Sequence, residues 1–193
     1  LPANFSTTAI IFAMVLVLMF LGGYPVKYLL AIVFAGVILF GIFVLAAKAF
    51  PGFLPNRVDT WTSRIENFTN DEDTEADYQI ERAMIAIARG GIAGTGIGKS
   101  VQRNFLPQSS SDFIYAIIVE EMGLIGALGV MLAYLMILFR IIIVATKANT
   151  VFGKLLVMGV GIPIIFQALV NMAVAVELFP VTGQTLPLVS SGG

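Results

Sequence analysis

Three acidic side chains lie at the start of a long apolar run, and they are the residues best suited to acid–base chemistry. Asp112 stands where a run of serines gives way to the apolar stretch that begins at Phe113. Glu120 and Glu121 follow inside that stretch. Acidic groups are costly in hydrocarbon, so carboxylates in such a place call for a reason. If the stretch crosses a bilayer, Asp112 lies at the membrane–water boundary, where it could act on a substrate that is half lipid and half water-soluble.

The same position also suits a purely structural role for Asp112. Serines and an aspartate before an apolar run are typical of a helix N-terminus, where the side chain caps backbone amides. From spacing alone capping is the favoured interpretation, and catalysis is the alternative. Glu120 and Glu121 cannot both face one direction, because neighbours on a helix are about 100° apart. We therefore expect at least one of them to face the protein interior or a wet cavity.

Composition narrows the chemistry and the class of protein. The chain contains no histidine, the commonest general base, and no cysteine, so a disulfide framework and a thiolate metal site are excluded. Acid–base chemistry must therefore come from Asp, Glu, Lys or Tyr. Hydrophobic residues make up 58% of the sequence and charged residues 12%, against about 25% charged in ordinary soluble domains. These proportions predict an integral membrane protein.

Four apolar runs predict an all-α membrane protein in a single domain. Each is near the ~20 residues that a spanning helix needs. The runs cover residues 5–21, 28–47, 113–139 and 155–176. The turn residues 22–25 separate the first two runs.

The distribution of basic residues orients these predicted helices. The linker at 140–154 carries three basic residues and no acid, which is typical of a cytoplasmic loop. Lys27 places the turn between the first two runs on the same side. Helix parity then puts the loop at 48–111 outside the cell. That loop is too long to be a bare connector.

Within the outer loop, residues 78–89 place Ile80, Met84 and Ile87 on one face of a short amphipathic helix. Two interpretations stay open for this helix. It could lie on the outer leaflet of the membrane, or it could pack on the spanning helices.

The segment 93–100, AGTGIGKS, fits a loose Walker A pattern, but a P-loop needs a preceding strand and a nucleotide. An amphipathic helix precedes it here, and the topology puts it outside, so we reject that interpretation. A loop whose amides and Lys99 touch an anion and a plain turn both remain open. Lys99 and Arg103 suit a pyrophosphate or a lipid headgroup. From these residues alone, lipid anchoring without a catalytic part is favoured.

Two further patterns have structural interpretations. The acidic run at 70–77 lacks metal-ligand spacing, so no metal site is predicted there. In the last apolar run, small and amide residues recur every four positions, which is typical of contacts between membrane helices and is favoured over a substrate groove. These residues are Gly159, Pro163, Gln167 and Asn171.

Several motifs occur in an order that resembles one known family. They are PANFST at residues 2–7, YQ at 78–79, the block ARGGIAGTGIGKSVQRNFLPQSSSDFIYAIIVEEMGLIG at 88–126, and FQALVNMAVAVELFPVTGQTLPLVSSGG at 166–193. The chain resembles the SEDS family of cell-wall polymerases (FtsW, RodA and SpoVE). The sequences of its motifs are closest to those of FtsW, the division branch. The match covers about the C-terminal half of the family's ten-helix fold. The four runs would be its sixth to ninth helices, and the chain is expected to be an internal piece of a larger membrane protein.

The resemblance implies a peptidoglycan glycosyltransferase that polymerises lipid II in the bacterial inner membrane, at the division septum. It implies a class B penicillin-binding transpeptidase and other divisome proteins as partners, and no nucleic acid. By position, Asp112 matches an aspartate regarded as catalytic in the family. Candidate substrate-binding residues are Lys99, Gln102, Arg103, Ser111, Glu120 and Glu121. Two departures, Gln108 for Glu and Thr182 for Lys, weaken any charge-based role carried to those positions.

One base can suffice for such a reaction, because pyrophosphate is already a good leaving group, whereas glycosidases need an acid as well. We expect Asp112 to accept the proton of the incoming 4-hydroxyl. Lys99, Arg103 or a divalent cation such as Mg²⁺ would neutralise the departing pyrophosphate. Two rival functions stay open: a lipid II flippase that uses polar groups in the spans, and a non-catalytic division scaffold.

Overall fold

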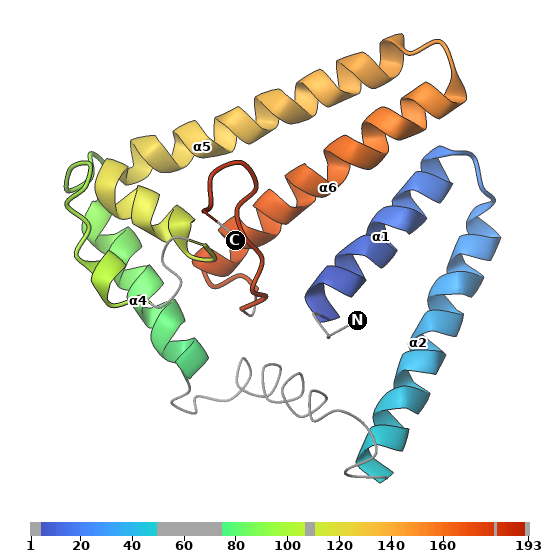
Figure 1. Cartoon of the computed structure of the whole chain (residues 1–193), viewed down its shortest axis with the longest axis horizontal. Coiled ribbons are helices and arrows are strands. Elements are labelled where there is room, and N and C mark those ends of the chain that lie inside the picture. The colour runs from blue at the N-terminus through green and yellow to red at the C-terminus, as the bar shows by residue number, and fades with distance from the viewer. Residues whose placement is uncertain (1–4, 50–74, 107–110, 180, 192–193) are drawn as a thin grey trace.

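The computed structural model describes residues 5–49, 75–106, 111–179 and 181–191. Every regular element within these ranges is a helix, which confirms the predicted all-α class for this part of the chain. Figure 1 shows two antiparallel pairs of long helices and a shorter helix beside the second pair. The elements are α1 (Phe5–Leu21), α2 (Val26–Ala49), α4 (Glu75–Gly90), the 3-10 helix η1 (Gln102–Asn104), α5 (Ile114–Lys147) and α6 (Val151–Ala175).

Among the described residues, three helices are long and apolar enough to cross a membrane: Val26–Ala46 within α2, the whole of α5, and the whole of α6. The first helix, α1, is also apolar, but it has only 17 residues. At about 1.5 Å per residue it extends about 25 Å, against about 30 Å of hydrocarbon. The described residues therefore support a membrane protein with three candidate spans, and the fourth predicted span is present as a shorter apolar helix.

The long helices leave apolar side chains uncovered. α5 packs along α6, and α1 contacts α6, while α2 packs on α1. Along α2, Leu30, Phe34 and Leu45 are each more than 60% exposed. A continuous exposed apolar surface of this kind marks contact with a membrane or with other protein segments.

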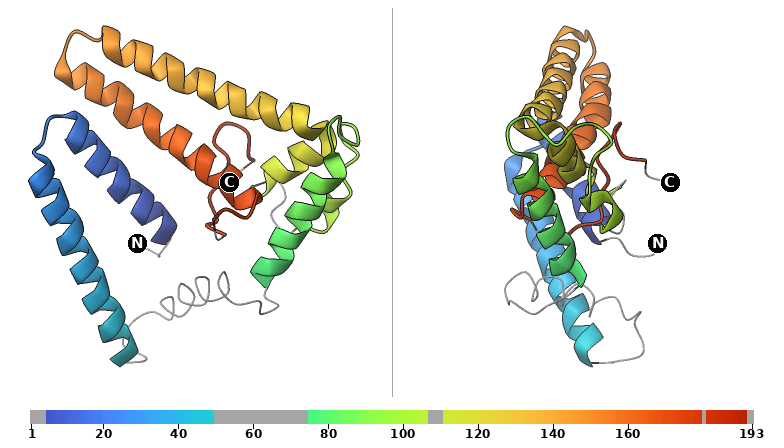
Figure 2. Two further views of the ribbon diagram at one scale, coloured as in Figure 1. Left: turned by 180° about the vertical axis from the view of Figure 1, so that it is seen from behind. Right: turned by 90° about the vertical axis from the view of Figure 1, so that its left-hand side faces the viewer.

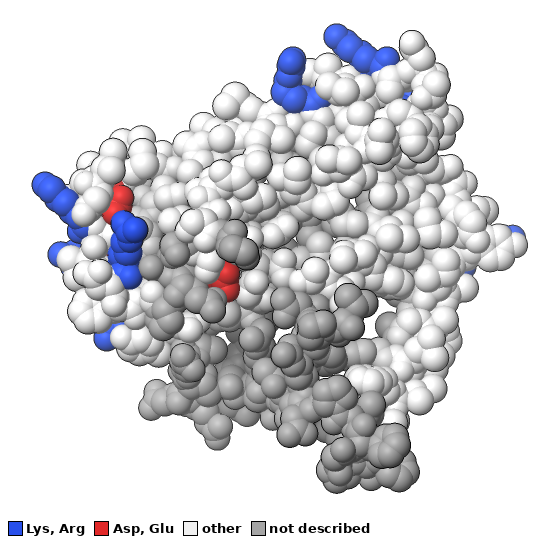
Figure 3. Space-filling model, viewed as in Figure 1, with Lys and Arg blue, Asp and Glu red and all other residues white. Residues whose placement is uncertain are grey.

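The two short basic turns lie at the same end of the helices, as predicted. A Cβ atom at Gly22 would lie 3.5 Å from Leu155, so the turn between α1 and α2 touches the start of α6. In Figure 3 the Lys and Arg side chains gather at the edges of the molecule, with a broad uncharged band over the helices between them. Basic residues at one end of a helix bundle are typical of its cytoplasmic side.

The predicted linker at 140–154 is mostly helical. Residues 140–147 continue α5, residues 151–154 begin α6, and only residues 148–150 separate the two helices. Nothing in 140–147 breaks a helix, and Lys147 near the C-terminus of α5 suits the negative end of the helix dipole. Thr150 caps α6, because its hydroxyl accepts a hydrogen bond of 3.0 Å from the Gly153 amide.

The predicted continuous span at 113–139 is interrupted. Gly123 has φ 65° and ψ −163°, which is not a helical conformation. Figures 1 and 2 show the first part of α5 running back toward the middle of the molecule, at a steep angle to the long remainder. Glu120 and Glu121 therefore lie next to a bend at one end of the long helix. They do not lie within an unbroken span, as the continuous apolar run at 113–139 had predicted.

The amphipathic helix expected at 78–89 is present as α4, and it packs against α5. Its buried face is formed by Ile80, Ala83 and Ala86, whereas Met84 is 40% exposed. The face of α4 that packs against α5 therefore contains small residues where large ones were predicted, because alanine lets the backbones of α4 and α5 come close. The structure favours the packed-helix interpretation. Residues 50–74 of the long loop lie outside the described residues.

Candidate functional site

The glycine-rich loop after α4 is bound to the bend in α5 by main-chain hydrogen bonds. The amides of Thr95 and Gly96 each lie 2.9 Å from the carbonyls of Glu120 and Glu121, and the Leu124 amide returns a 2.9 Å bond to the Gly91 carbonyl. These bonds use carbonyls and amides that the interruption of α5 leaves without helical partners. The loop is therefore a docked turn, and the Walker A interpretation is rejected on structural grounds as well.

Glycine is required where the two backbones touch. Cβ atoms added to Gly90, Gly94 or Gly123 would overlap main-chain atoms of the opposite segment. Gly94 and Gly123 also have positive φ angles of 79° and 65°. Side chains at these positions would separate the loop from the bend, because neither backbone can move without breaking the hydrogen bonds between them.

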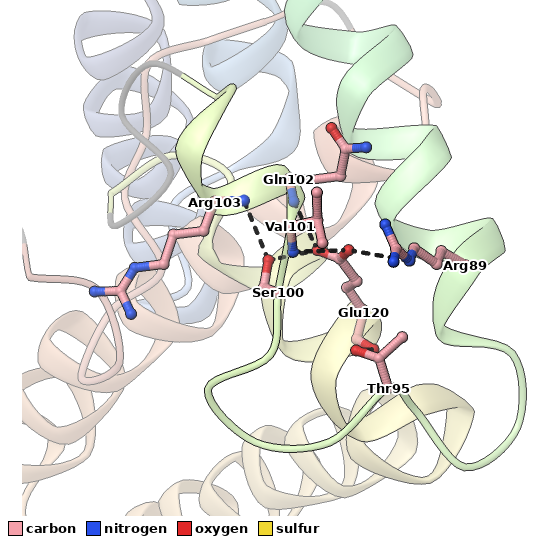
Figure 4. A network of polar contacts seen from close by, with 7 residues as sticks. All are labelled: Arg89, Thr95, Ser100, Val101, Gln102, Arg103 and Glu120. Atoms are coloured by element: carbon pink, nitrogen blue, oxygen red, sulfur yellow. Dashed lines mark hydrogen bonds and ion pairs between the residues drawn. The ribbon is translucent and has the colours of Figure 1, made fainter.

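Glu120 lies inside this contact, and its carboxylate binds the segment that follows the loop. The Ser100 hydroxyl donates to Oε2, the Val101 amide lies 3.2 Å from Oε1, and the Gln102 amide lies 3.3 Å from Oε2. Figure 4 shows the carboxylate between this segment and Arg89 on α4. A side chain from the bend therefore holds the first residue of η1 and the two residues before it.

The charge of Glu120 has one cationic neighbour among these contacts. The Arg89 Nε lies 3.9 Å from Glu120 Oε1; the Glu120 side chain is fully buried, and that of Arg89 is 48% exposed. A buried carboxylate loses its hydration, which is costly unless hydrogen bonds and an opposite charge replace it. The three hydrogen-bond donors and the charge of Arg89 together replace the lost hydration of Glu120, so each of them helps to stabilise the buried carboxylate.

The two candidate cations flank this segment. Lys99 and Arg103 are exposed, and they stand immediately before Ser100 and immediately after Gln102. The Arg103 amide donates a 3.1 Å bond to the Ser100 hydroxyl, whereas its guanidinium points away from Glu120 in Figure 4. Gln102 is buried, and its Oε1 has no hydrogen-bond partner within the described residues.

Asp112 lies near the start of the bent part of α5 and is buried. Helix α5 begins at Ile114, and its N-cap residue is Phe113, whose side chain makes no cap bond. The capping position therefore falls one residue after the aspartate. The main-chain carbonyl of Asp112 accepts a 2.7 Å hydrogen bond from Asn171 Nδ2, which also donates a 2.7 Å bond to the Gln184 carbonyl.

The C-terminal segment 181–191 forms the other side of the Asp112 environment. The Ser190 hydroxyl donates a 2.7 Å bond to the Ser111 carbonyl. Gly183 has a φ angle of 66°, and a Cβ atom there would lie 3.7 Å from Asp112 Oδ2. The carboxylate thus faces a stretch of backbone at close range. Gln184 ties the same segment to α1 through a 3.0 Å bond to Thr7.

The structure therefore separates the predicted site residues into two groups. One group surrounds Glu120 and includes Gln102, with Lys99 and Arg103 at its edges. The other surrounds Asp112 and includes Ser111. Glu121 belongs to the bend through its carbonyl, and its side chain is half-buried. Gln108 lies outside the described residues.

Sequence reasoning missed several partners of these two groups. Arg89 and Ser100 had no assigned role at Glu120, and Gly183, Gln184 and Ser190 had none at Asp112. The only signal was the amide pattern on α6, which predicted structural contacts. Asn171 and Gln167 do make structural contacts, but these join α6 to residues outside the helices: Asn171 donates to the Asp112 and Gln184 carbonyls, and Gln167 donates a 3.1 Å bond to the Thr185 carbonyl.

Comparison with known proteins places this geometry in a family. The model of the FtsW/RodA/SpoVE family, described as "Cell cycle protein", matches residues 1–193. The chain belongs to this family. A relative from Nitrosococcus halophilus, named "Probable peptidoglycan glycosyltransferase FtsW", is 35% identical over 100% of this chain and 49% of its own length. A protein of the same name from Dichelobacter nodosus is 37% identical over 100% of this chain and 47% of its own length.

A solved structure shares the fold of this FtsW/RodA/SpoVE family member. It is described as "Structural coordination of polymerization and crosslinking by a peptidoglycan synthase complex" and aligns with a TM-score of 0.63 and 25% identity. The alignment covers 97% of this chain and 50% of the other. The chain thus spans about half the length of the relatives that it matches.

Proposed function

We propose that the full-length protein containing this chain is a peptidoglycan glycosyltransferase of cell division, which polymerises lipid II at the outer face of the bacterial inner membrane. Family membership and the names of its relatives support this activity. The observation that carries the proposal is the buried Asp112 carboxylate, which faces the Gly183 backbone at an end of the helix bundle. The main chain of Asp112 is fixed to α6 by Asn171, which positions this carboxylate beside the C-terminal segment.

The arrangement of basic turns supports an outer position for Asp112. The two short turns lie together, with Lys27 at the start of α2 and Lys154 at the start of α6, and the start of α5 lies at the far end of α6 (Figure 1). With the basic turns in the cytoplasm, Asp112 and the docked glycine loop face outward. In this topology the chain contributes four of about ten helices, α1 being the shortest of its four.

The reaction needs one proton acceptor and one stabilised leaving group. The 4-hydroxyl oxygen of the acceptor sugar forms a bond to C1 of the donor, while the bond from C1 to the pyrophosphate oxygen breaks. The configuration at C1 inverts, the hydroxyl proton passes to the Asp112 carboxylate, and the lipid pyrophosphate leaves with the bonding electrons. A base held in a fixed geometry contributes about 10²–10⁴-fold to the rate of such a step.

Lys99 and Arg103 are the cations that this chain offers to the pyrophosphate. Both are exposed, and they flank the segment bound to Glu120. Preorganised cations lower the barrier by stabilising charge that develops as the bond breaks. The divalent cation remains a prediction from the sequence. Within the described residues, no cluster of three or more acidic side chains could hold one.

Two rival functions make different predictions. A flippase needs a polar path through the membrane, but Glu120 is buried in a protein network at the bend, and Asn171 and Gln167 are bound to the C-terminal segment. These contacts favour a polymerase. A scaffold that docks a transpeptidase would not need the Asp112 carboxylate. The solved relative belongs to a peptidoglycan synthase complex, which is compatible with a transpeptidase partner for either function.

The deciding experiment uses the purified full-length protein, labelled lipid II and the variant Asp112→Asn. Polymer from the wild type and none from Asp112→Asn would support the proposal. The variant Glu81→Gln is the matched control, because Glu81 is an exposed acid on α4 outside both groups. Undiminished polymer from Asp112→Asn would exclude the base assignment, and translocation without polymer would favour the flippase.

A further inference from the structure

We propose that Glu120 is a positioning residue, which sets the place of Lys99 and Arg103 for the pyrophosphate of the substrate. This inference rests on the proposed function and assigns Glu120 a task other than direct contact with substrate. Its carboxylate is fully buried and accepts bonds from Ser100, Val101 and Gln102, so its oxygens are occupied by the protein.

The three donors are the three residues between the two cations. Lys99 precedes Ser100, and Arg103 follows Gln102. One carboxylate therefore determines the backbone path of the whole segment that separates them. The Ser100 hydroxyl extends this control, because it donates to Glu120 and accepts the Arg103 amide at 3.1 Å. A displacement of Glu120 would move both cations together.

Glu120 is itself held at the bend of α5, where movement is restricted. Its own carbonyl accepts the Thr95 amide at 2.9 Å and the Thr95 hydroxyl at 3.0 Å. The loop and the bend fit together only because Gly94 and Gly123 lack side chains. The same bend lies eleven residues after Asp112 in the chain. The position of the cations is thus linked through α5 to the helix that begins beside the proposed base.

Arg89 completes the arrangement by charge. Its Nε lies 3.9 Å from Glu120, and it reaches the carboxylate from α4. Arg89, Lys99 and Arg103 carry like charges on neighbouring segments, and the Glu120 carboxylate beside Arg89 offsets part of their mutual repulsion. Glu120 therefore keeps the cationic segment close to α4 despite that repulsion.

A binding experiment that does not require polymerisation tests this role. Inorganic pyrophosphate is titrated calorimetrically into the full-length wild-type protein and into Glu120→Gln, Ser100→Ala and Lys99→Ala/Arg103→Ala. We expect Glu120→Gln to weaken binding by about tenfold, which is the size of effect that follows from losing one charged hydrogen-bond network. Ser100→Ala removes one of the three donors and keeps the buried carboxylate. It is the substitute test if Glu120→Gln does not fold, and it should also weaken pyrophosphate binding.

The decisive result is the combination of variants. If Glu120 acts through Lys99 and Arg103, adding Glu120→Gln to the double variant weakens binding no further. Losses that multiply would overturn the proposal, and so would an absence of measurable pyrophosphate binding by the wild type. Glu81→Gln is the control and should bind like the wild type. Binding is measured without lipid II, so the two proposals are tested separately. If Asp112→Asn did not stop polymerisation, the proposed base would be refuted, and the pyrophosphate titration would still test the role of Glu120.

Discussion

Asn171 on α6 donates a 2.7 Å hydrogen bond to the main-chain carbonyl of Asp112, and the two residues are 59 positions apart in the chain. The same amide nitrogen donates to Gln184, so one side chain joins α6, the start of α5 and the C-terminal segment. Asn171 is itself 1% exposed. The position of the proposed base therefore depends on Asn171, a residue of another helix that binds the main chain of Asp112 and not its carboxylate.

Replacing Asn171 with leucine should destabilise the protein and lower its activity. Two buried carbonyls would lose their donor, and each unsatisfied buried group costs about 1–3 kcal/mol. We expect a lower midpoint of thermal unfolding in detergent and a loss of polymerisation that exceeds the loss of folded protein. Asn149→Leu is the control, because Asn149 is exposed in the turn between α5 and α6. Equal behaviour of the two variants would show that the Asn171 bonds are unimportant.

Gly90→Ala should destabilise the contact between α4 and α5. The added methyl group would overlap the Val119 carbonyl, and the φ angle of Gly90 is ordinary, so the expected loss of stability comes from packing and not from backbone strain. Overpacking of this kind costs about 1–3 kcal/mol.

The matched control for Gly90→Ala is Gly129→Ala in the long part of α5. A Cβ atom at Gly129 would meet nothing within 4 Å, and alanine favours the helix. Thermal unfolding should therefore shift downward for Gly90→Ala and stay level or rise slightly for Gly129→Ala. A similar shift for both variants would contradict the close backbone contact at Gly90.

Tyr134→Phe should loosen the C-terminal segment. The Tyr134 hydroxyl donates to the Pro187 carbonyl, and Tyr134 is 4% exposed. Loss of a neutral hydrogen bond costs about 1 kcal/mol, so hydrogen exchange of residues 181–190 should become faster. Tyr28→Phe is the control, because Tyr28 is 50% exposed and its ring contacts would remain. Unchanged exchange in Tyr134→Phe would show that other bonds hold the segment.

Lys99→Ala and Arg103→Ala should each slow polymerisation, and the effect should shrink as salt is added. Both side chains are exposed, and charge interactions in water are screened over about 8 Å at physiological ionic strength. Polymerisation rates at two salt concentrations measure this. Lys147→Ala at the opposite end of α5 is the control and should leave the rate unchanged. Normal rates for both variants would exclude a role for these cations in the reaction.

Composition and local pattern were enough to predict the helices. Apolar runs of suitable length form helices in a membrane because every backbone group must be bonded within its own segment. This reasoning located α1, α2 and α6 closely, whereas the predicted span at 113–139 ended before α5 does at Lys147 and missed its interruption. Charge asymmetry placed the two short connections at one end. The family motifs then indicated the activity and the importance of Asp112.

The bend at Gly123 could not be predicted from the same patterns. Hydrophobicity continues on both sides of it, and a single glycine in an apolar run is common in membrane helices. Its non-helical conformation is stabilised by bonds to residues 91–96, a segment that precedes the whole first part of α5. Only the close approach of two glycine-containing backbones makes the interruption favourable.

What the sequence by itself determined is therefore the class of protein and the approximate extent of its long helices, because these depend on residue types and short-range periodicity. The family resemblance carried by its motifs added the expected activity and Asp112 as a candidate base. What only the tertiary structure decided is which residues act together. Glu120 meets Ser100 across 20 positions, and Asp112 meets Asn171 across 59. Such contacts arise when buried polar groups must find partners after the helices pack, and no local pattern specifies those partners in advance.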